Sequence, residues 1–164
     1  MLQQPAVHNR QSPTYVFMGV TMKILLSSEQ TGGQFSLIEG VMPPGGDGGL
    51  HVHYHEDESM VLLEGQLEVT IGDKVFELFA GESYFAPRDV PQRLRNRGRI
   101  PARAMLVTTP GGFDNFIAKA GVPLSDAVLS ASLTPPEPHQ LARLSELAEE
   151  FGIKILVPPE ANGD

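Results

Sequence analysis

The sequence contains no cysteine and no tryptophan among its 164 residues. Without cysteine, the chain cannot form disulfides, cysteine zinc sites, iron–sulfur clusters or thiol nucleophiles, so any metal must be bound by His, carboxylate or amide groups. Basic residues are also few: 12 Lys and Arg stand against 20 Asp and Glu, which makes the formal net charge −8. That sign is wrong for a protein that binds nucleic acid by neutralising phosphates, so we expect no nucleic-acid partner.

Long apolar runs are missing as well. No stretch approaches the roughly 18 apolar residues that a membrane helix requires, so we expect no membrane partner. The segment Met1 to Pro13 is polar and lacks the apolar centre of an export signal. It predicts a loose N-terminal tail on a cytoplasmic protein.

Turn-forming residues, in contrast, are abundant, with 17 Gly and 14 Pro. From Tyr15 to Pro110 they separate short runs of β-branched and aromatic residues, a pattern typical of an all-β sandwich or barrel. The length favours a single domain. The predicted strands are Tyr15 to Val20, Met22 to Leu26, Gln34 to Met42, Leu50 to His53, Ser59 to Leu63, Gln66 to Ile71, Lys74 to Leu78, Ser83 to Ala86, Gln92 to Asn96 and Ala102 to Thr108.

The pattern changes after Pro110. Gly112 to Lys119 carries aromatic and aliphatic residues at i, i+3 and i+4 spacing, which predicts a short helix that folds back as a lid or end cap. A stiff Pro-rich linker, Leu133 to Pro138, precedes a predicted amphipathic helix from His139 to Phe151. Ile153 to Val157 is predicted as a last strand.

The chemistry is concentrated in one short window. Three of the five His residues lie at positions 51, 53 and 55, and three acidic residues follow at once. In an extended strand, residues i and i+2 project to the same side, so His51 and His53 present two imidazoles to one face. The chain then turns and returns as a strand, which would bring Glu58 back across from the pair. Together these residues supply two imidazoles and one carboxylate to a metal ion.

A surface strand with solvated imidazoles and acids is the alternative interpretation. It fits this window poorly, because His51 and His53 lie between a Gly/Pro-rich loop and a strongly apolar strand. Inside a barrel, two imidazoles beside a carboxylate are costly unless they are paired or bound to metal.

The residues around this window resemble the motifs of the cupin superfamily. The first motif reads Gly, five residues, His, one residue, His, three or four residues, Glu, six residues, Gly. The second reads Gly, five residues, Pro, one residue, Gly, two residues, His, three residues, Asn. The first frame is complete here, and the second keeps its spacing but has Asp and Gln at its second Gly and its His. The positions are Gly45, His51, His53, Glu58 and Gly65 for the first motif, and Gly81, Pro87, Asp89, Gln92 and Asn96 for the second.

This resemblance implies a single cupin domain, a jelly-roll barrel of two facing antiparallel sheets with short C-terminal helices. It divides the chain into a loose tail at residues 1–13, the barrel at 14–110, and a helical extension with a final strand at 111–164. The closest likeness is to single-domain bacterial cupins described as quercetin 2,3-dioxygenase-like, whose relatives include polyketide-tailoring cyclases. In that group, three His and one Glu usually bind the metal, and the Glu is the proposed base. Cupins also commonly pair through barrel sheets and terminal strands, so we expect a homodimer that uses Tyr15 to Leu26 and the helix near Leu141.

Gln92 departs from the motif, and it leaves four arrangements open. An amide oxygen is a weaker donor than imidazole, so His51, His53, Glu58 and Gln92 together would favour iron, manganese or nickel over copper. Gln92 could instead drop out, which leaves a facial triad typical of non-haem iron oxygenases. His55 could take the vacant position, or the site could have lost its metal and become a binding pocket. Asp89 is expected to alter only a turn.

The resemblance implies a small-molecule substrate and a metal-dependent oxygenase acting on a flavonol-like or polyketide-like enol. One divalent ion, Fe, Ni, Mn or Zn, would act as Lewis acid, with Glu58 as the catalytic proton acceptor. The inward parity of Met60 and Leu62 with Glu58 predicts that they line the substrate pocket, and Phe85 is assigned to the same cavity. A non-oxidative isomerase or cyclase and a non-catalytic ligand-binding protein are the alternatives.

Overall fold

The computed structural model describes residues 12–125 and 137–160. Most of the predicted tail, residues 1–11, and linker residues 133–136 lie outside these ranges. The strands are β1 (Thr14–Phe17), β2 (Val20–Leu26), β3 (Ser36–Met42), β4 (Leu50–His53), β5 (Asp57–Glu64), β6 (Gln66–Ile71), β7 (Lys74–Phe79), β8 (Ser83–Ala86), β9 (Gln92–Arg95), β10 (Ala102–Thr109), β11 (Val122–Pro123) and β12 (Ile153–Val157). The helices are α1 (Phe113–Ala120) and α2 (Pro138–Glu150). No helix in the described ranges is long and apolar enough to cross a membrane.

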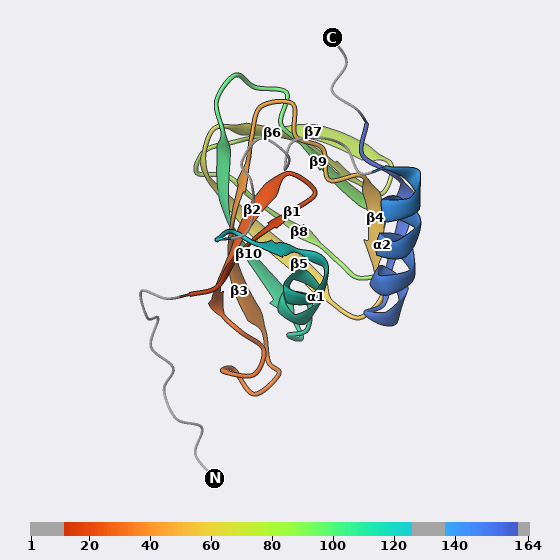
Figure 1. The fold of residues 1–164 in the computed structure, drawn as a ribbon. Coiled ribbons are helices and arrows are strands. Elements are labelled where there is room, and N and C mark those ends of the chain that lie inside the picture. The colour runs from red at the N-terminus through yellow and green to blue at the C-terminus, as the bar shows by residue number, and fades with distance from the viewer. Residues whose placement is uncertain (1–11, 126–136, 161–164) are drawn as a thin grey trace.

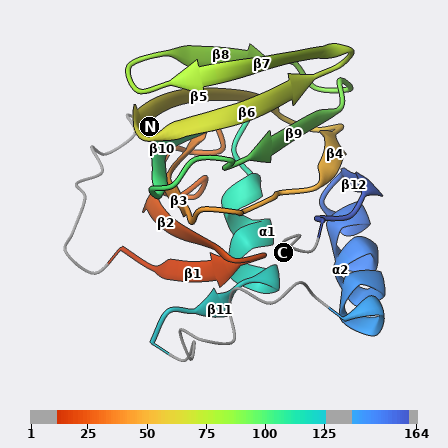
Figure 2. The same cartoon turned by 90° about the horizontal axis from the view of Figure 1, so that it is seen from above.

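The strands form two antiparallel sheets. The larger sheet has the order β11-β1-β2-β3-β10-β5-β8, and the smaller has the order β12-β4-β9-β6-β7. Helix α1 packs on β1 and β3, whereas α2 packs on β12 at the edge of the smaller sheet (Figures 1 and 2). This arrangement confirms the predicted all-β class and the short C-terminal helices. The barrel consists of two separate hydrogen-bonded sheets around one core.

Strand β10 shows how sequence alternation builds that core. Its residues alternate strictly, and Ala102, Ala104, Leu106 and Thr108 are buried. Successive side chains of a strand point to opposite faces, so these four project between the sheets. Strand β10 pairs with both β3 and β5. Its register therefore sets which residues of these two neighbours lie beside its buried side chains.

A two-residue turn connects β6 and β7. Ile71 pairs with Lys74, so Gly72 and Asp73 alone connect the strands. Gly72 has a φ of 60°, a conformation that glycine adopts without a steric penalty. The local sequence therefore determines this register.

The C-terminal extension adds a strand to the smaller sheet. Pro138 lies in the first turn of α2, and Gln140 accepts a hydrogen bond of 2.9 Å from the backbone N–H of Glu137 in a capping box. Gly152, with a φ of 71°, follows the helix and leads into β12. Strand β12 pairs antiparallel with β4, as the sequence predicted a last strand here, but only the structure identifies its partner.

Strand β11 was not predicted. It contains only Val122 and Pro123, too few residues to show an alternating pattern. These two residues pair with Val16 and Tyr15 on the outer edge of β1. The free edge of β1, which lies in the segment expected to contact a second subunit, is therefore partly covered by the chain's own β11.

A buried ion pair fastens the loop before β4 to β9. The Arg93 Nε donates a hydrogen bond of 2.9 Å to Asp47 Oδ1, and the backbone N–H of Glu160 donates one of 2.8 Å to Asp47 Oδ2. Desolvation alone would raise the pKa of Asp47, but the hydrogen bonds from Arg93, Glu160 and Gly49 outweigh it and hold this pKa below its ordinary value.

This depressed pKa makes a prediction about acid stability. A carboxyl group whose pKa is lower in the folded state contributes stability that is present above the unfolded pKa, about 3.9 for Asp, and is lost as the pH falls through the folded value. We expect Asp47→Asn to reduce stability at neutral pH and to weaken the dependence of unfolding on pH below about 4. Urea unfolding at a series of pH values measures both effects, and parallel pH profiles for the two proteins would contradict the assignment.

Candidate metal centre

Strand β4 places two imidazoles side by side. His51 and His53 are two residues apart in an extended strand, and their ring centroids lie 5.2 Å apart. The strand is held between β12, where Ile155 opposes His51, and β9, where Gln92 opposes His51. Both histidines therefore sit in the interior of the smaller sheet rather than at its edge.

The His51 ring is oriented by the loop before it. Its Nδ1 lies 3.0 Å from the carbonyl oxygen of Gly49. A carbonyl oxygen only accepts hydrogen bonds, so Nδ1 carries the proton and Nε2 is left with its lone pair. Desolvation, followed by the neighbouring His53, lowers the pKa of His51 to about 4, so the ring is neutral at neutral pH.

The His53 ring is buried and flanked by two carboxylates. It is 2% exposed, with Nδ1 3.3 Å from Glu56 Oε2 and Nε2 3.6 Å from Glu58 Oε2. The ring of Phe113 from helix α1 contacts it edge-on, with a centroid distance of 5.1 Å. Despite this enclosure, His53 Nε2 has no hydrogen-bond partner.

Glu58 reaches the histidines from the opposite sheet. It lies in β5, is buried, and accepts a hydrogen bond of 2.7 Å at Oε1 from the hydroxyl of Tyr84 in β8. Burial, together with the negative charge of Glu58 and this hydrogen bond, raises the pKa of Tyr84 well above its ordinary value. Tyr84 therefore stays protonated and donates to one Glu58 oxygen, while the other oxygen faces His53.

Gln92 is the fourth predicted donor. It begins β9 directly opposite His51 and is 2% exposed. Directly opposed residues of paired strands project to the same face of the sheet, so the Gln92 side chain lies beside the His51 ring. Its Oε1 atom is buried without a hydrogen-bond partner.

These side chains suit a divalent cation. Buried polar atoms without partners are rare and unfavourable, yet His53 Nε2 and Gln92 Oε1 are both unpaired and both can donate a lone pair to a metal. No group of three or more His, Asp or Glu side chains in residues 12–125 and 137–160 has the spacing of a complete metal site. A full ligand set would thus combine the two histidines and Glu58 with Gln92.

Two further residues of the motif region lie away from the donors. His55 is exposed in the turn after β4, and its ring packs so closely on Gly152 that a Cβ there would approach its Nδ1 to 2.5 Å. It does not occupy the position left by the missing third His. Asp89 has a φ of 67° and donates its backbone N–H to the carbonyl of His53 at 2.8 Å, so it forms a turn as expected.

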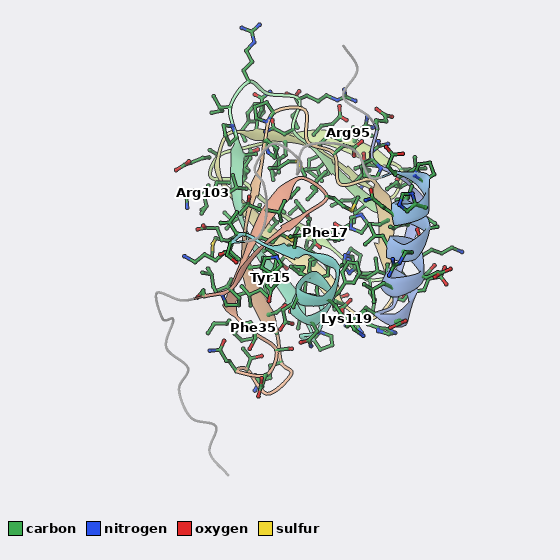
Figure 3. All side chains as sticks on the ribbon, in the orientation of Figure 1. Tyr15, Phe17, Phe35, Arg95, Arg103 and Lys119 are labelled. Atoms are coloured by element: carbon green, nitrogen blue, oxygen red, sulfur yellow. The ribbon has the colours of Figure 1, made fainter. Side chains whose placement is uncertain are left out.

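An apolar cavity opens beside the donors. Helices α1 and α2 and both sheets contribute to its wall, and Phe17 extends into the middle of the molecule while Arg103 lies at its outer side (Figure 3). The lining residues are Phe17, Met18, Val20, Met22, Ile38, Gly40, Met42, Gly48, His51, Glu58, Met60, Leu67, Leu94, Ala102, Ala104, Leu106, Phe113, Phe116, Ala148, Ile153 and Ile155.

The predicted pocket residues have different outcomes. Met60 is buried and lines the cavity, whereas Leu62 is fully buried in the core and does not reach the cavity wall. The assignment of Phe85 is wrong: its side chain is 58% exposed and points away from the core. Strand β8 turns Tyr84 inward instead, because Tyr84 pairs with Met60 in register.

Sequence reasoning missed several residues around the donors. Tyr84 was overlooked because two aromatic residues are adjacent in β8, and alternation alone does not show which one faces inward. Glu56 carried a usable signal, an acid three residues after His53, but its contact depends on the turn. Ile153 and Ile155 lie over a hundred residues from β4 in the sequence, so only the pairing of β12 reveals their position.

Comparisons with known proteins identify relatives of this chain. The family described as Cupin domain matches residues 39–108. An uncharacterized protein of Methanocaldococcus jannaschii is 31% identical over 75 residues, which cover 46% of this chain and 60% of that protein. The alginate biosynthesis protein AlgA of Pseudomonas putida is 28% identical over 110 residues, which cover 67% of this chain and 22% of that protein. The chain thus spans less than two thirds of the length of these curated relatives.

A solved structure shares the fold. The sugar phosphate isomerase from a cupin superfamily of Silicibacter pomeroyi superposes with a TM-score of 0.55 at 22% identity, covering 64% of this chain and 75% of that one. The family match begins within β3 and ends within β10, so it contains both motif frames and all four donor residues. Through this segment, the chain is similar to the cupin domain family.

Proposed function

We propose that this protein is a metal-dependent oxygenase that acts on an apolar enol of the flavonol-like or polyketide-like class. The observation that carries the proposal is the pair of unpartnered buried atoms, His53 Nε2 and Gln92 Oε1. His53 Nε2 lies 3.6 Å from Glu58, Gln92 opposes His51, and both Glu58 and His51 line an apolar cavity. His51, His53, Glu58 and Gln92 would hold the cation. A bound divalent ion would supply a Lewis acid for a substrate oxygen and a position for dioxygen.

The mixture of donors bears on the choice of ion. Two imidazole nitrogens, a carboxylate and an amide oxygen form a harder set than three imidazoles would, and oxygen donors suit iron, manganese and nickel better than copper. Zinc is compatible with the same groups. We therefore propose Fe, Ni, Mn or Zn.

The cavity wall supports an apolar substrate. Its polar side chains are those of His51 and Glu58, and the other lining residues are aliphatic, aromatic, Met or Gly. No Lys or Arg is among the lining residues, so a phosphate group would find no cation there to pair with. The wall instead excludes water and holds a largely hydrocarbon or aromatic body.

In this proposal, Glu58 is the residue that accepts a proton from the substrate. Tyr84 holds Oε1 of Glu58 by a hydrogen bond, which leaves Oε2 directed toward His53 and the donor cluster. An ionised carboxylate in that place accepts the proton of an enol or hydroxyl group, and Tyr84 maintains its orientation as the proton arrives. Tyr84 is therefore a positioning residue that orients Glu58 and does not itself contact the substrate in this proposal.

A non-oxidative isomerase or cyclase that uses the same metal ion as Lewis acid is the second candidate. The buried pair of Glu58 and Tyr84 offers a carboxylate and a phenol at 2.7 Å, groups that can transfer a proton without dioxygen. The Silicibacter pomeroyi structure is described as a sugar phosphate isomerase, which is consistent with such chemistry on this fold.

Metal analysis followed by oxygen uptake tests these proposals. Elemental analysis of the purified protein should find a bound divalent metal, and a flavonol panel should give oxygen consumption that a chelator abolishes and Glu58→Gln strongly reduces. Substrate conversion without oxygen uptake would favour the isomerase or cyclase. A protein that binds none of the four metals would contradict both enzymes and leave a ligand-binding role.

Gln92→His provides a separate prediction. Because residue 92 opposes His51 and has an unpaired buried oxygen, an imidazole there should bind the cation more tightly than the amide does. We expect metal retention during dialysis against a chelator to increase by about tenfold or more, on the scale of one stronger ligand. Unchanged retention would show that residue 92 does not contact the metal.

Homodimer formation is a further proposal. Strand β11 already pairs with Tyr15 and Val16 at the β1 edge. A second subunit would therefore have to pair with another strand edge or pack on the outer face of a sheet. Leu63 and Phe85 are exposed large apolar residues of the larger sheet, and such residues are common in subunit contacts. Light scattering over a range of concentrations tests the proposal, and a constant monomer mass would contradict it.

A further inference from the structure

We propose that Glu56 is a positioning residue for His53: its carboxylate accepts the Nδ1–H of His53 and thereby directs the Nε2 lone pair toward the cation. The inference rests on the proposed metal centre, since it concerns how one of its donors is oriented. Glu56 belongs neither to the four donors nor to the residues that line the cavity.

Glu56 is buried in direct contact with His53. Its side chain is buried between the turn after β4 and the start of α1, with Oε2 3.3 Å from His53 Nδ1. Its other oxygen lies beside Gly112, where an added Cβ would approach Oε1 to 3.1 Å. Gly112 has a φ of 152°, so both its conformation and its lack of a side chain make room for the carboxylate. The chain thus keeps a buried acid against the far side of the imidazole.

The other contacts of His53 determine what this acid does. Phe113 and His51 contact the ring at centroid distances of 5.1 and 5.2 Å, so the plane of the imidazole is constrained by packing. What packing does not determine is which nitrogen carries the proton. An ionised carboxylate only accepts, so Glu56 selects the tautomer with the proton on Nδ1. Nε2 is then free to bind metal beside Glu58 Oε2, 3.6 Å away.

The two histidines are oriented by unlike partners. His51 donates to the neutral carbonyl of Gly49, whereas His53 donates to a carboxylate. A carboxylate partner increases the basicity of a metal-bound imidazole more than a neutral carbonyl does, and loss of such a partner typically weakens metal affinity about 10–100-fold. His53 is therefore the stronger imidazole donor of the pair. The competing arrangement is an imidazolium shared between Glu56 and Glu58, which would leave no lone pair for a metal.

Nitrogen NMR of the zinc-loaded protein separates these arrangements. With Zn²⁺ as a diamagnetic probe, long-range ¹⁵N–¹H correlation of the His side chains should show His53 protonated at Nδ1 and unprotonated at Nε2. A proton on His53 Nε2, or protons on both nitrogens, would overturn the proposal. Because this measurement uses the unmodified chain, it does not depend on any variant folding.

Zinc affinity provides the second measurement. Glu56→Ala should raise the dissociation constant for Zn²⁺ about 10–100-fold. Glu56→Gln should raise it less, because an amide oxygen still accepts the Nδ1–H but carries no charge. Asp57→Asn is the matched control: Asp57 is the adjacent acid, but it pairs with Arg88 at 3.1 Å, so its loss should leave zinc affinity unchanged.

The outcomes distinguish this inference from the proposed function. If the unmodified protein binds no Zn²⁺ or other divalent metal, the proposed metal centre fails. If it binds Zn²⁺ and Glu56→Ala binds equally well, only the role of Glu56 fails. If Glu56→Gln and Asp57→Asn lost zinc affinity equally, the loss would be a general effect of removing negative charge, which would also overturn the inference. If Glu56→Ala does not fold, the zinc affinities of Glu56→Gln and Asp57→Asn, together with the NMR result, decide whether Glu56 orients His53.

Discussion

His51→Ala is expected to lower the affinity of the protein for its divalent cation by more than about 100-fold, a greater loss than removing an outer hydrogen-bond partner causes. The substitution removes one of the two imidazole nitrogens, whose Nε2 lone pair is available because Nδ1 donates to Gly49. His53 then remains as the only imidazole of the set, and the amide and carboxylate oxygens beside it are weaker ligands for iron, nickel or zinc. Competition with a fluorescent chelator measures the change.

His55→Ala is the matched control for this loss. It removes an imidazole two residues from His53, but the ring is exposed and packs on Gly152. We expect cation affinity within about twofold of the unmodified protein, because a surface substitution away from the donors has small effects. If His55→Ala lost as much affinity as His51→Ala, the assignment of donors would have to be revised.

Arg93→Ala is expected to reduce the free energy of unfolding by about 3–5 kcal/mol, because removing one partner of a buried ion pair leaves the other charge uncompensated. Arg93 is 7% exposed and Asp47 is also 7% exposed, and their pairing joins β9 to the loop that leads into β4. Without the guanidinium, the Asp47 carboxylate keeps only backbone donors, among them the N–H groups of Gly49 and Glu160. Urea denaturation followed by circular dichroism measures the loss.

Arg97→Ala provides the comparison for this prediction. Arg97 also pairs with an acid, Glu68, at 3.0 Å, but its side chain is largely exposed. Exposed ion pairs contribute about 0–1 kcal/mol, so we expect a loss of about 1 kcal/mol or less. Similar losses for the two variants would indicate that burial does not set the contribution of the Asp47–Arg93 pair.

The strand pattern was predictable because its signals are local. Strands β4, β6 and β12 have the predicted bounds, since alternating residues and flanking turn residues specify them. Helix α2 begins and ends one residue earlier than predicted, as its capping residues lie just before the apolar stripe. Strand β11 was missed because two residues carry no pattern; it forms only where the chain meets β1.

The positions of the candidate donors were predictable to the same extent. The spacing of His51 and His53 places them on one face of any extended strand, and the motif frame singled out Gln92. The inward direction of Met60 followed from its parity with Glu58. The direction of Phe85 did not, because its strand contains adjacent aromatic residues and its phase is set by pairing with β5.

The sequence by itself determined the donor types, their spacing along β4 and the alternation that builds two sheets, since each depends on neighbours within a few residues. The tertiary structure decided which distant groups surround those donors. Tyr84 on Glu58, Glu56 on His53, and Ile153 and Ile155 beside β4 all depend on strand register and on how a turn or helix packs. Contacts between residues far apart in the chain require the whole fold, because no local pattern specifies which faces will meet.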